Sequence, residues 1–387
     1  MFIHHSGIIG GAGVSLINTI DFLSDNNEVY VYVSSEPEDM FNLFKNMSNN
    51  VHVDTYGRRI GALTYYSGGD SWFSKRFLYR MILIRKQKQY WNDLVRELNP
   101  EIIVVNSKIV CWLSSLSEVK KRKSVCFVRE TIKGQKNNIV NKQISKYLDG
   151  FSKVVFISEY DKRKENLKIA KTYVVHNYVA KNQFDTSITK QDACKKLDVT
   201  EKTFNILYVG GVSEMKGFDL AVQATLMLGE KCTLIVAGNN FDDAMKTKDK
   251  HTQKYVKKWK KYILESDKNH QIHFLGRVKD MSPCYAACDV LVFPMRSPHQ
   301  SRPAFEAGCF HKPVVITDSE NVSEFVRNNY NGLTFKNGDV NSLFECLSVL
   351  RDNKEYCKEL GFNNFLNTKM NHNMDISCSK IKKIIEE

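Results

Sequence analysis

Short apolar runs alternate with longer amphipathic stretches along the whole chain. The runs have the length and β-branched content of strands, and the stretches between them have helical periodicity. The strand candidates of the first half are MFIHH, EVYVYVS, VHVDTY, EIIVVNS, SVCFVRE, KVVFIS and TYVVHN. Continuous apolar strands separated by helices are typical of parallel sheets that are covered on both faces. The pattern therefore predicts an α/β fold.

A polar segment, residues 181–203, divides this pattern because it contains no strand candidate. The strand candidates that follow it are FNILYVGG, CTLIVAG, QIHFLG, DVLVFPM, PVVITD and GLTFK. We therefore predict two Rossmann-like, doubly wound domains, at residues 1–180 and 204–370, joined by this linker. Residues 371–387 are predicted as a helix that packs back on the first domain. Ligands of such sheets bind beyond the carboxyl ends of the strands, so we expect a site in a cleft between the domains.

Composition adds constraints on the partners and the compartment. The chain has 387 residues, long for one core, and a net charge of +13, which favours phosphate-bearing ligands, anionic membrane surfaces or other polyanions. Nucleic acid is not expected, because no recognition module accompanies the charge. Ten cysteines without a Cys-x-x-Cys pair favour reduced, buried thiols and a cytoplasmic protein. Neither a signal peptide nor an apolar run of ~18–20 residues is visible, so any membrane contact is expected to be peripheral.

A glycine-rich stretch, HHSGIIGGAGVSL, occupies residues 4–16 between the first strand and a helix. Glycines allow the backbone to approach a ligand closely, and a helix N-terminus attracts anions. We therefore take Gly11 and Gly13 as ligand-binding candidates. The stretch is not a dinucleotide fingerprint, because Leu16 stands at its third glycine position. The alternative is a tight turn that packs the helix on the strand.

A second glycine turn follows a strand in FNILYVGGVSEMKGFDLAVQA, residues 204–224. Gly210 and Gly211 end the strand, and Lys216 stands just before the helix. A lysine at this place offers a point charge beside free backbone N–H groups, which suits a diphosphate. The alternative is a solvated lysine near a first helical turn.

The gap between two strand candidates, SPHQSRPAFEAGCFHKPVVIT at residues 297–317, is crowded with polar side chains. We expect His299, Gln300, Arg302 and Glu306 to converge at the strand end, with Glu306 in the first turn of a helix that begins near Arg302. An acid in a first turn can also simply complement the helix dipole, but that explanation leaves the other three residues unexplained.

Charged residues also end a strand of the first domain, in CFVRETIKG. Arg129 and Glu130 are expected at the ligand-binding edge of the sheet, where either can act on a substrate. The other possibility is that they pair with each other.

A basic stretch with aromatic residues covers residues 72–91. Its members are Trp72, Phe73, Lys75, Arg76, Phe77, Tyr79, Arg80, Arg85, Lys86, Lys88 and Trp91. Such a helix is suited to the surface of an anionic membrane. It can equally be a core helix with a solvated face.

The second half resembles retaining glycosyltransferases of family 4, among the glycosyl transferases group 1, which have the GT-B architecture of two Rossmann-like domains facing each other across a cleft. The matching segments, which occur in the family's order between residues 206 and 343, are ILYVGGVSEMKGFDLAVQA, LIVAGN, IHFLGRVKDMSPCYAACDVLVFP, RPAFEAGCFHKPVVIT and EFVRNNYNGLTFKNGDVNSL. The first half matches more loosely, through its glycine loop, FISEYDK and VVHNYV.

This resemblance implies a nucleotide-sugar donor held mainly by the second domain. It implies that Lys216 contacts the donor diphosphate, that Glu306 contacts the ribose, and that the loop around Gly11 closes on the diphosphate and sugar. Glu324 lies in the segment after PVVIT where the family often has an acidic residue.

Two positions depart from the family's pattern. Pro298 stands where the first glutamate of the Glu-x7-Glu motif is expected, and Gly211 stands where an arginine is expected. His299, Gln300 and Arg302 are the candidates that replace the missing groups. The usual histidine of the first domain is not evident near Arg129 and Glu130.

The expected activity is transfer of a sugar, with retention, to a hydroxyl of a glycan or lipid-linked acceptor in polysaccharide or glycan synthesis. Lys216 and Arg302 would stabilise the departing nucleoside diphosphate. Glu130 is the catalytic candidate of the first domain. We expect no metal and no cofactor, because Asp-x-Asp does not occur. Two alternatives remain: a catalytically silent homologue that binds a nucleotide or glycan as a partner subunit, and a nucleotide-sugar epimerase.

Overall fold

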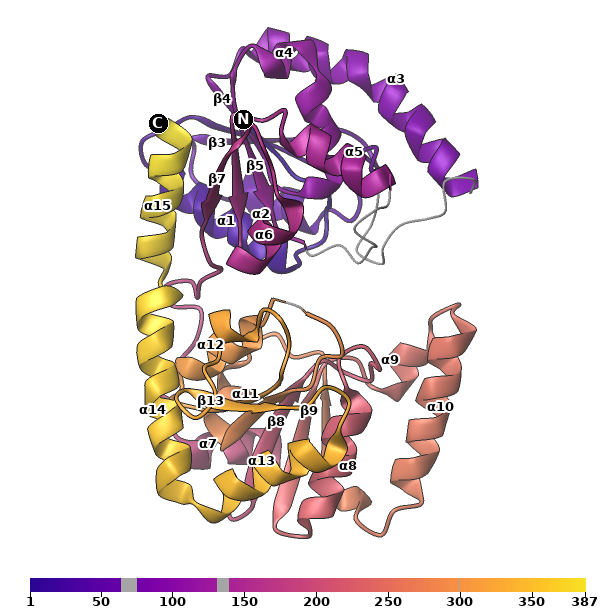
Figure 1. Ribbon diagram of the computed structural model, residues 1–387, viewed down its shortest axis with the longest axis vertical. Coiled ribbons are helices and arrows are strands. Elements are labelled where there is room, and N and C mark those ends of the chain that lie inside the picture. Colours follow the sequence, from indigo (N-terminus) through magenta and orange to yellow (C-terminus); the bar gives the residue numbers. More distant parts are fainter. Residues whose placement is uncertain (64–74, 131–138, 299) are drawn as a thin grey trace. The chain divides into compact units, whose positions relative to one another are not determined.

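The computed structural model describes residues 1–63, 75–130, 139–298 and 300–387. The chain folds as two compact units (Figure 1). We call Met1–Asn177 together with Met374–Glu387 the N-terminal unit, and Tyr178–Asn373 the C-terminal unit. Each unit contains one parallel sheet covered by helices on both faces, which is the predicted pair of Rossmann-like, doubly wound folds.

The sheet of the N-terminal unit has seven parallel strands among the described residues, in the spatial order β3-β2-β1-β4-β5-β6-β7. These strands are β1 (Phe2–Ile3), β2 (Val29–Val33), β3 (Val51–Thr55), β4 (Ile102–Val105), β5 (Lys123–Val128), β6 (Lys153–Phe156) and β7 (Lys171–Val174). The inner strands are mostly apolar, because both faces of the sheet are buried.

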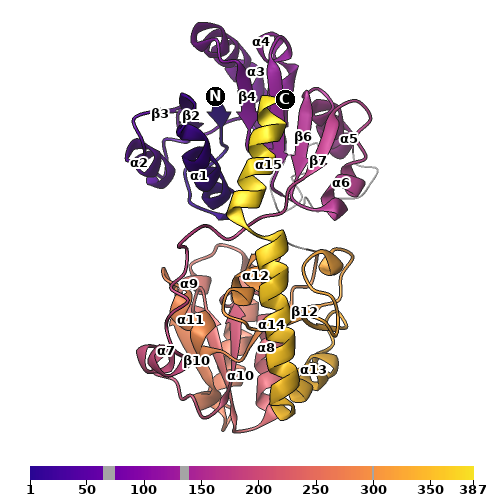
Figure 2. The ribbon, with the colours of Figure 1, turned by 90° about the vertical axis from the view of Figure 1, so that its left-hand side faces the viewer.

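Helices cover the two faces of this sheet. They are α1 (Gly11–Ser24), α2 (Asp39–Lys45), α3 (Lys75–Leu98), the 3₁₀ helix η1 (Lys108–Ser115), α4 (Ser117–Lys120), α5 (Ile139–Leu148), α6 (Glu159–Glu165) and α15 (Met374–Glu386). Side chains of α3, η1 and α5 share one hydrophobic cluster with alternate residues of the central strands. Helices α1 and α15 lie side by side (Figure 2), so the end of the chain returns to this unit.

The sheet of the C-terminal unit has six parallel strands in its described part, in the order β10-β9-β8-β11-β12-β13. These strands are β8 (Phe204–Val209), β9 (Cys232–Ala237), β10 (Ile272–Gly276), β11 (Val290–Phe293), β12 (Val314–Thr317) and β13 (Gly332–Phe335). Successive residues of β8 alternate between two clusters: Ile206 and Tyr208 face one, and Leu207 faces the other.

One face of this sheet packs against α8 (Phe218–Leu228), α10 (Lys250–Leu264), α13 (Val340–Asp352) and α14 (Lys354–Asn371). The other face packs against α7 (Lys190–Leu197), α11 (Ser282–Ala287) and α12 (Arg302–Gly308). The remaining elements are α9 (Phe241–Met245) and the 3₁₀ turns η2 (Asn269–Gln271) and η3 (Val322–Glu324). Helix α14 packs against α12, and α13 leads into its first turn (Figure 1).

The segment predicted as a linker, residues 181–203, is instead part of the C-terminal unit. It contains α7, which begins after the N-cap Thr189 and packs against α11 through the buried Ala193 and Cys194. Two small buried side chains produce no recognisable apolar stripe, which is why the sequence pattern missed this helix.

The end of the chain is divided between the two units at residues 371–374. Helix α14 reaches Asn371 within the C-terminal unit, whereas α15 belongs to the N-terminal unit. Ile381 and Ile384 of α15 are buried, and the Lys153 Nζ donates to the Ile384 carbonyl oxygen at 2.6 Å. Within the described ranges, no helix combines the length and the apolar content that a membrane crossing requires.

Candidate active site

The strand order of the C-terminal sheet defines the place where a ligand is expected. Strands β8 and β11 are neighbours at the centre of the sheet. The chain continues from β8 to β9 on one side of this pair, and from β11 to β12 on the opposite side. The loops after β8 and β11 therefore diverge, and the crevice beyond such a switch point is the usual binding place of an open α/β sheet. Lys216 follows β8, and Gln300, Arg302 and Glu306 follow β11, so the structure brings both predicted groups to this edge.

Gly217 allows the loop after β8 to pack closely against the loop after β11. Gly217 is the N-cap of α8, with φ +71°, and a Cβ atom on it would lie 2.0 Å from the Pro294 carbonyl oxygen. Only glycine fits this combination of a left-handed backbone and a close approach. The Arg296 N–H also donates to the Met215 carbonyl oxygen at 3.0 Å. The residue between Met215 and Gly217, Lys216, is thus carried on a firmly held turn.

Lys216 is a half-buried cation at this turn. Its aliphatic stem lies over Gly210, where an added Cβ would be 3.0 Å from the Lys216 Cδ. Burial lowers the pKa of the Lys216 ammonium below its ordinary value of 10.5. Among the described residues, no carboxylate lies within ion-pair distance of it. A partly desolvated cation without a counter-ion is costly, and such groups are typical of binding sites for anions.

An ion pair that the sequence analysis missed fixes the start of α8. The Arg296 guanidinium donates to both carboxylate oxygens of Asp219, at 2.7 and 2.6 Å. The Tyr255 hydroxyl donates to Asp219 Oδ1 at 2.9 Å. This bidentate pair ties the loop after β11 to the first turn of α8, next to Lys216. No local pattern marks it, because Asp219 and Arg296 are far apart in the sequence.

Glu306 lies in the second turn of α12, so the prediction of a first-turn position was wrong. The helix begins at Arg302, and the two side chains pair at the i,i+4 spacing, with 3.3 Å between Arg302 Nε and Glu306 Oε1. The Tyr285 hydroxyl donates to Glu306 Oε2 at 2.7 Å, and Gln183 Nε2 donates to Oε1 at 3.5 Å. The carboxylate is therefore held in place, and it offsets the charge of Arg302.

The other residues predicted around this edge lie on two loops. Gln300 and Pro298 are half-buried in the loop after β11. Glu324 is half-buried at the end of η3, which follows β12. His299 lies outside the described residues. The described members of the predicted set thus lie on the loops after two neighbouring strands.

In the N-terminal unit, Gly11 and Gly13 lie within α1 rather than in the turn before it. They are its first and third residues, and Gly13 packs against Met40, whose Sδ would be 3.0 Å from an added Cβ. This contact agrees with the alternative that a glycine serves helix packing. The N-cap Gly10 provides no side-chain cap and has open space where its Cβ would be, so the first N–H groups of α1 remain available to an anion.

A buried polar cluster occupies the switch point of this unit, between β1 and β4. The Ser107 hydroxyl donates to Glu130 Oε1 at 2.6 Å, and the Lys108 N–H donates to Oε2 at 3.2 Å. Arg129 Nε donates to Asn106 Oδ1 at 3.1 Å. Arg129 and Glu130 are therefore each held by residues that follow β4, rather than by each other.

Two histidines follow β1 in the same cluster, and the sequence analysis did not select them. His4 Nδ1 lies 3.2 Å from Asn106 Nδ2. Burial lowers the pKa of the His5 imidazole, although the nearby Glu130 carboxylate partly opposes this shift. Burial lowers the pKa of the His4 imidazole well below its ordinary value. Both rings are thus neutral bases near pH 7. The His-His pair directly after an apolar run was the available signal.

Residues 189–365 match the family model of glycosyl transferases group 1. These residues are thus similar to a group 1 glycosyltransferase domain. A glycosyltransferase of Methanocaldococcus jannaschii, labelled uncharacterized, is 28% identical over 234 residues, covering 59% of this chain and 58% of that protein. A 41.2 kDa protein of the cps region of Klebsiella pneumoniae is 22% identical over 208 residues, 52% of each. The chain thus spans just over half the length of these curated relatives.

Solved structures share the whole fold. Anabaena HepE in complex with UDP has a TM-score of 0.79 at 17% identity, covering 100% of this chain and 98% of that one. WaaG, a glycosyltransferase involved in lipopolysaccharide biosynthesis, has a TM-score of 0.67 at 12% identity, covering 100% and 99%. These likenesses show that the two Rossmann-like units are those of the GT-B fold.

The geometry of the C-terminal unit explains the glycine at position 211. Gly211 has φ +61°, and a Cβ atom there would lie 2.4 Å from the Asn239 backbone nitrogen. An arginine would therefore disrupt this turn. Arg277, which follows β10, donates from its Nε to Asn239 Oδ1 at 2.7 Å. This arginine reaches the same turn from a different strand, and the sequence analysis did not select it.

In the described part of the chain, no group of three or more His, Cys, Asp or Glu residues is arranged to hold a metal ion.

Proposed function

We propose that the chain is a glycosyltransferase that moves a sugar from a nucleotide-sugar to an acceptor hydroxyl. The observation that carries this proposal is Lys216, a half-buried ammonium without a counter-ion among the described residues, at the switch point of a unit similar to a group 1 domain. A donor diphosphate supplies the negative charge that this ammonium lacks. The resemblance to retaining enzymes supports retention at the sugar carbon.

The main chemical demand is stabilisation of the leaving group. The bond between the sugar C1 and the diphosphate oxygen breaks, and negative charge grows on the phosphate. Lys216 and the N–H groups at the start of α8 supply fixed positive potential for it. We propose that Arg277 takes the place of the arginine missing at Gly211. Arg302 is paired with Glu306, so we propose that it mainly positions that carboxylate for the donor ribose.

We propose that Gln300 and Glu324, which follow β11 and β12, complete the donor site around the sugar and the nucleotide. His299 is proposed for the same role from its place in the sequence alone. For a retaining transfer, the acceptor hydroxyl forms the new bond to C1, and its proton passes to an oxygen of the leaving phosphate. No protein base is then required, and we propose no cofactor and no metal.

We propose that the N-terminal unit binds the acceptor, a glycan or a lipid-linked glycan of polysaccharide synthesis. Glu130 and the neutral His5 lie at the carboxyl edge of its sheet, and both can accept hydrogen bonds from sugar hydroxyls. The first turn of α1, in which Gly11 is exposed, supplies further N–H donors in the same unit. Glu130 is thus proposed to bind and orient the acceptor.

Helix α3 is proposed to contact an anionic membrane surface that carries the acceptor. Its buried side contains Trp91 and also Arg80, which is only 7% exposed and so does not belong to the basic face. Leu78 and Tyr79 are 62% and 56% exposed. Residues 72–74 and the side chain of Arg76 lie outside the described residues. Exposed apolar and cationic side chains on one helix suit the headgroup region of a bilayer.

A nucleotide-sugar panel tests the proposal. Bound ligand raises the melting temperature by mass action, and UDP-sugars lead the panel because the HepE structures hold UDP and UDP-glucose. The donor that stabilises the chain is then incubated with glycan acceptors, and the product is identified by mass spectrometry. Acceptor-dependent transfer is the expected result. A changed sugar without any acceptor would indicate an epimerase, and binding without turnover would indicate a silent homologue; either result contradicts the proposal.

A further inference from the structure

A cavity of about 490 Å³ lies at the amino-terminal edge of the C-terminal sheet. Its wall includes Phe204 at the start of β8, and Lys231, Asp289 and Pro313, which directly precede β9, β11 and β12. We call it the basal cavity. The donor site proposed above lies at the carboxyl ends of the same strands. Since β8 has six residues, the two places are separated by about 20 Å of strand.

Positive charge dominates the wall of the basal cavity. The wall contains one histidine, His311, and seven lysine or arginine side chains. The latter are Lys190, Lys202, Lys231, Lys312, Arg351, Lys354 and Lys358. Its carboxylates are Glu201, Asp289 and Asp352. Cations gathered around one concave space repel one another, and low-dielectric walls focus their field into it. This arrangement favours an anionic ligand.

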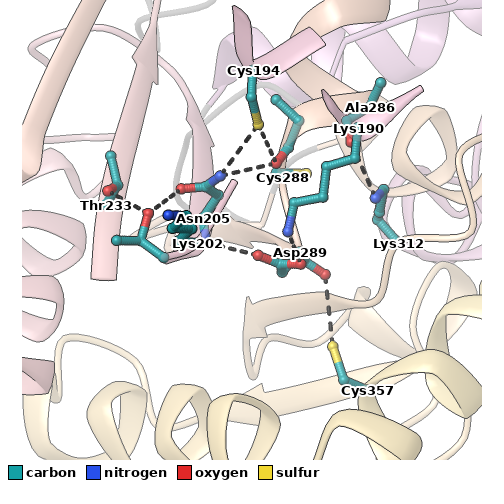
Figure 3. Close-up of polar contacts among 12 residues, drawn as sticks. Lys190, Cys194, Lys202, Asn205, Thr233, Ala286, Cys288, Asp289, Lys312 and Cys357 are labelled. Atoms are coloured by element: carbon teal, nitrogen blue, oxygen red, sulfur yellow. Dashed lines mark hydrogen bonds and ion pairs between the residues drawn. The ribbon is translucent and has the colours of Figure 1, made fainter. Parts of the chain in front are cut away.

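Two of the carboxylates are already neutralised within the wall. Asp289 accepts from the Lys190 Nζ at 2.6 Å and from the backbone N–H of Asn205 at 2.8 Å, and Figure 3 shows the Lys190 and Asp289 side chains pointing toward each other. Asp352 pairs with Arg351 at 2.7 Å. These carboxylates are therefore poorly placed to offset the other lysines.

Four lysines of the wall have no carboxylate partner among the described residues. They are Lys202, Lys231, Lys312 and Lys354. Lys312 is oriented by its bond to the Ala286 carbonyl oxygen at 3.3 Å (Figure 3). Lysine ammonium groups bind phosphate as point charges, and several of them around one space suit a ligand with more than one negative charge.

A buried asparagine organises the wall beside these lysines. Asn205 Nδ2 donates to the Thr200 and Ala287 carbonyl oxygens at 3.0 and 3.2 Å, and its Oδ1 accepts from the Thr203 hydroxyl at 3.0 Å. These contacts, several of which are drawn in Figure 3, fix the turn that carries Lys202. The cationic wall is thus partly preorganised, which lowers the cost of binding.

We propose that the basal cavity binds a small soluble organic phosphate with at least two negative charges. Its volume falls within the range of about 300–1,000 Å³ for small-molecule sites. Phe204, Pro313 and Leu350 add an apolar surface for the carbon skeleton of the ligand. The site is separate from the donor site, so it does not depend on the proposed transferase activity.

Fructose 1,6-bisphosphate is a suitable probe because it carries two phosphates and no nucleobase. Its binding is measured by isothermal titration calorimetry at fixed ionic strength, in a Lys216→Met background that weakens the donor site. The test variant adds Lys231→Ala and Lys354→Ala. The matched control adds Lys254→Ala and Lys257→Ala, which remove the same charge from exposed positions of α10.

The proposal predicts that the probe binds in the Lys216→Met background and that its Kd rises at least tenfold in the test variant. The control should change the Kd less than twofold. Equal urea unfolding of the three proteins shows that folding is intact, and Lys202→Glu provides a second disruption of the cavity. Absence of binding in the Lys216→Met background overturns the proposal, and so does an equal loss in test and control variants.

Discussion

Replacing Lys216 with methionine should weaken diphosphate binding without weakening the fold. An ammonium about 4 Å from a phosphate charge contributes about 4 kcal/mol at an effective dielectric constant of 20. Loss of one preorganised charge contact of this kind typically costs ~10²–10³ in turnover. We therefore expect UDP-sugar transfer to fall by roughly 10²–10³ in Lys216→Met, measured as kcat with the acceptor in excess.

The same substitution should leave the free protein as stable as the wild type or more stable. Methionine keeps the apolar stem that lies over Gly210 but removes a half-buried charge that has no counter-ion in the described part of the chain. Functional groups of this kind commonly reduce stability, and their removal raises the free energy of unfolding by about 1 kcal/mol. Urea unfolding measures this change.

The pH dependence of binding gives a further check on Lys216. Burial favours the neutral amine in the free protein, and a bound diphosphate favours the ammonium. UDP affinity should therefore be full at neutral pH and fall as the pH rises through the lowered pKa, below 10.5. The stability advantage of Lys216→Met should shrink over the same range, because the neutral amine is less costly to bury. Lys216→Arg, which stays charged, should not show the decline in affinity.

Two results would refute this reasoning about Lys216. Near-normal transfer by Lys216→Met would remove the residue from the diphosphate site. A clear loss of stability in that variant, with normal binding per folded molecule, would show that the lysine has a structural role instead.

Other predictions follow from the same geometry. Gly217→Ala should reduce the free energy of unfolding more than Gly229→Ala, because both have positive φ but only the former meets a carbonyl oxygen at 2.0 Å; equal losses in urea unfolding would argue against the close packing of the two loops. Glu306→Gln should weaken nucleotide-sugar binding measured by calorimetry, and unchanged affinity would contradict its ribose role. Reversing the charges of Lys75 and Arg85 should reduce pelleting with anionic vesicles more than reversing the charges of two lysines on α10. A wild-type protein that does not pellet with the vesicles would contradict the membrane proposal.

Most strands could be predicted because buried parallel strands form continuous apolar runs. EVYVYVS contains β2, and FNILYVGG contains β8. Helix α7 could not be predicted, because only Ala193 and Cys194 of its eight residues are buried. Arg80 shows a related difficulty: a basic residue in a basic stretch looks exposed, yet its position on α3 turns it toward the core side.

The candidate site could be predicted only where one short segment carries the signal. Lys216 beside a glycine turn is such a case. The pair of Asp219 and Arg296 could not be found this way, since it depends on two loops that meet only in the folded unit. Likewise, the space around Gly211 depends on a neighbouring strand, so the sequence showed a missing arginine but not the reason for it.

A crystal structure of the chain with UDP tests the central claim most directly. The account predicts the diphosphate beyond the carboxyl ends of β8 and β11, with the Lys216 Nζ within hydrogen-bond distance of a phosphate oxygen and the ribose beside Glu306. A diphosphate bound elsewhere, with Lys216 directed into solvent, would contradict it.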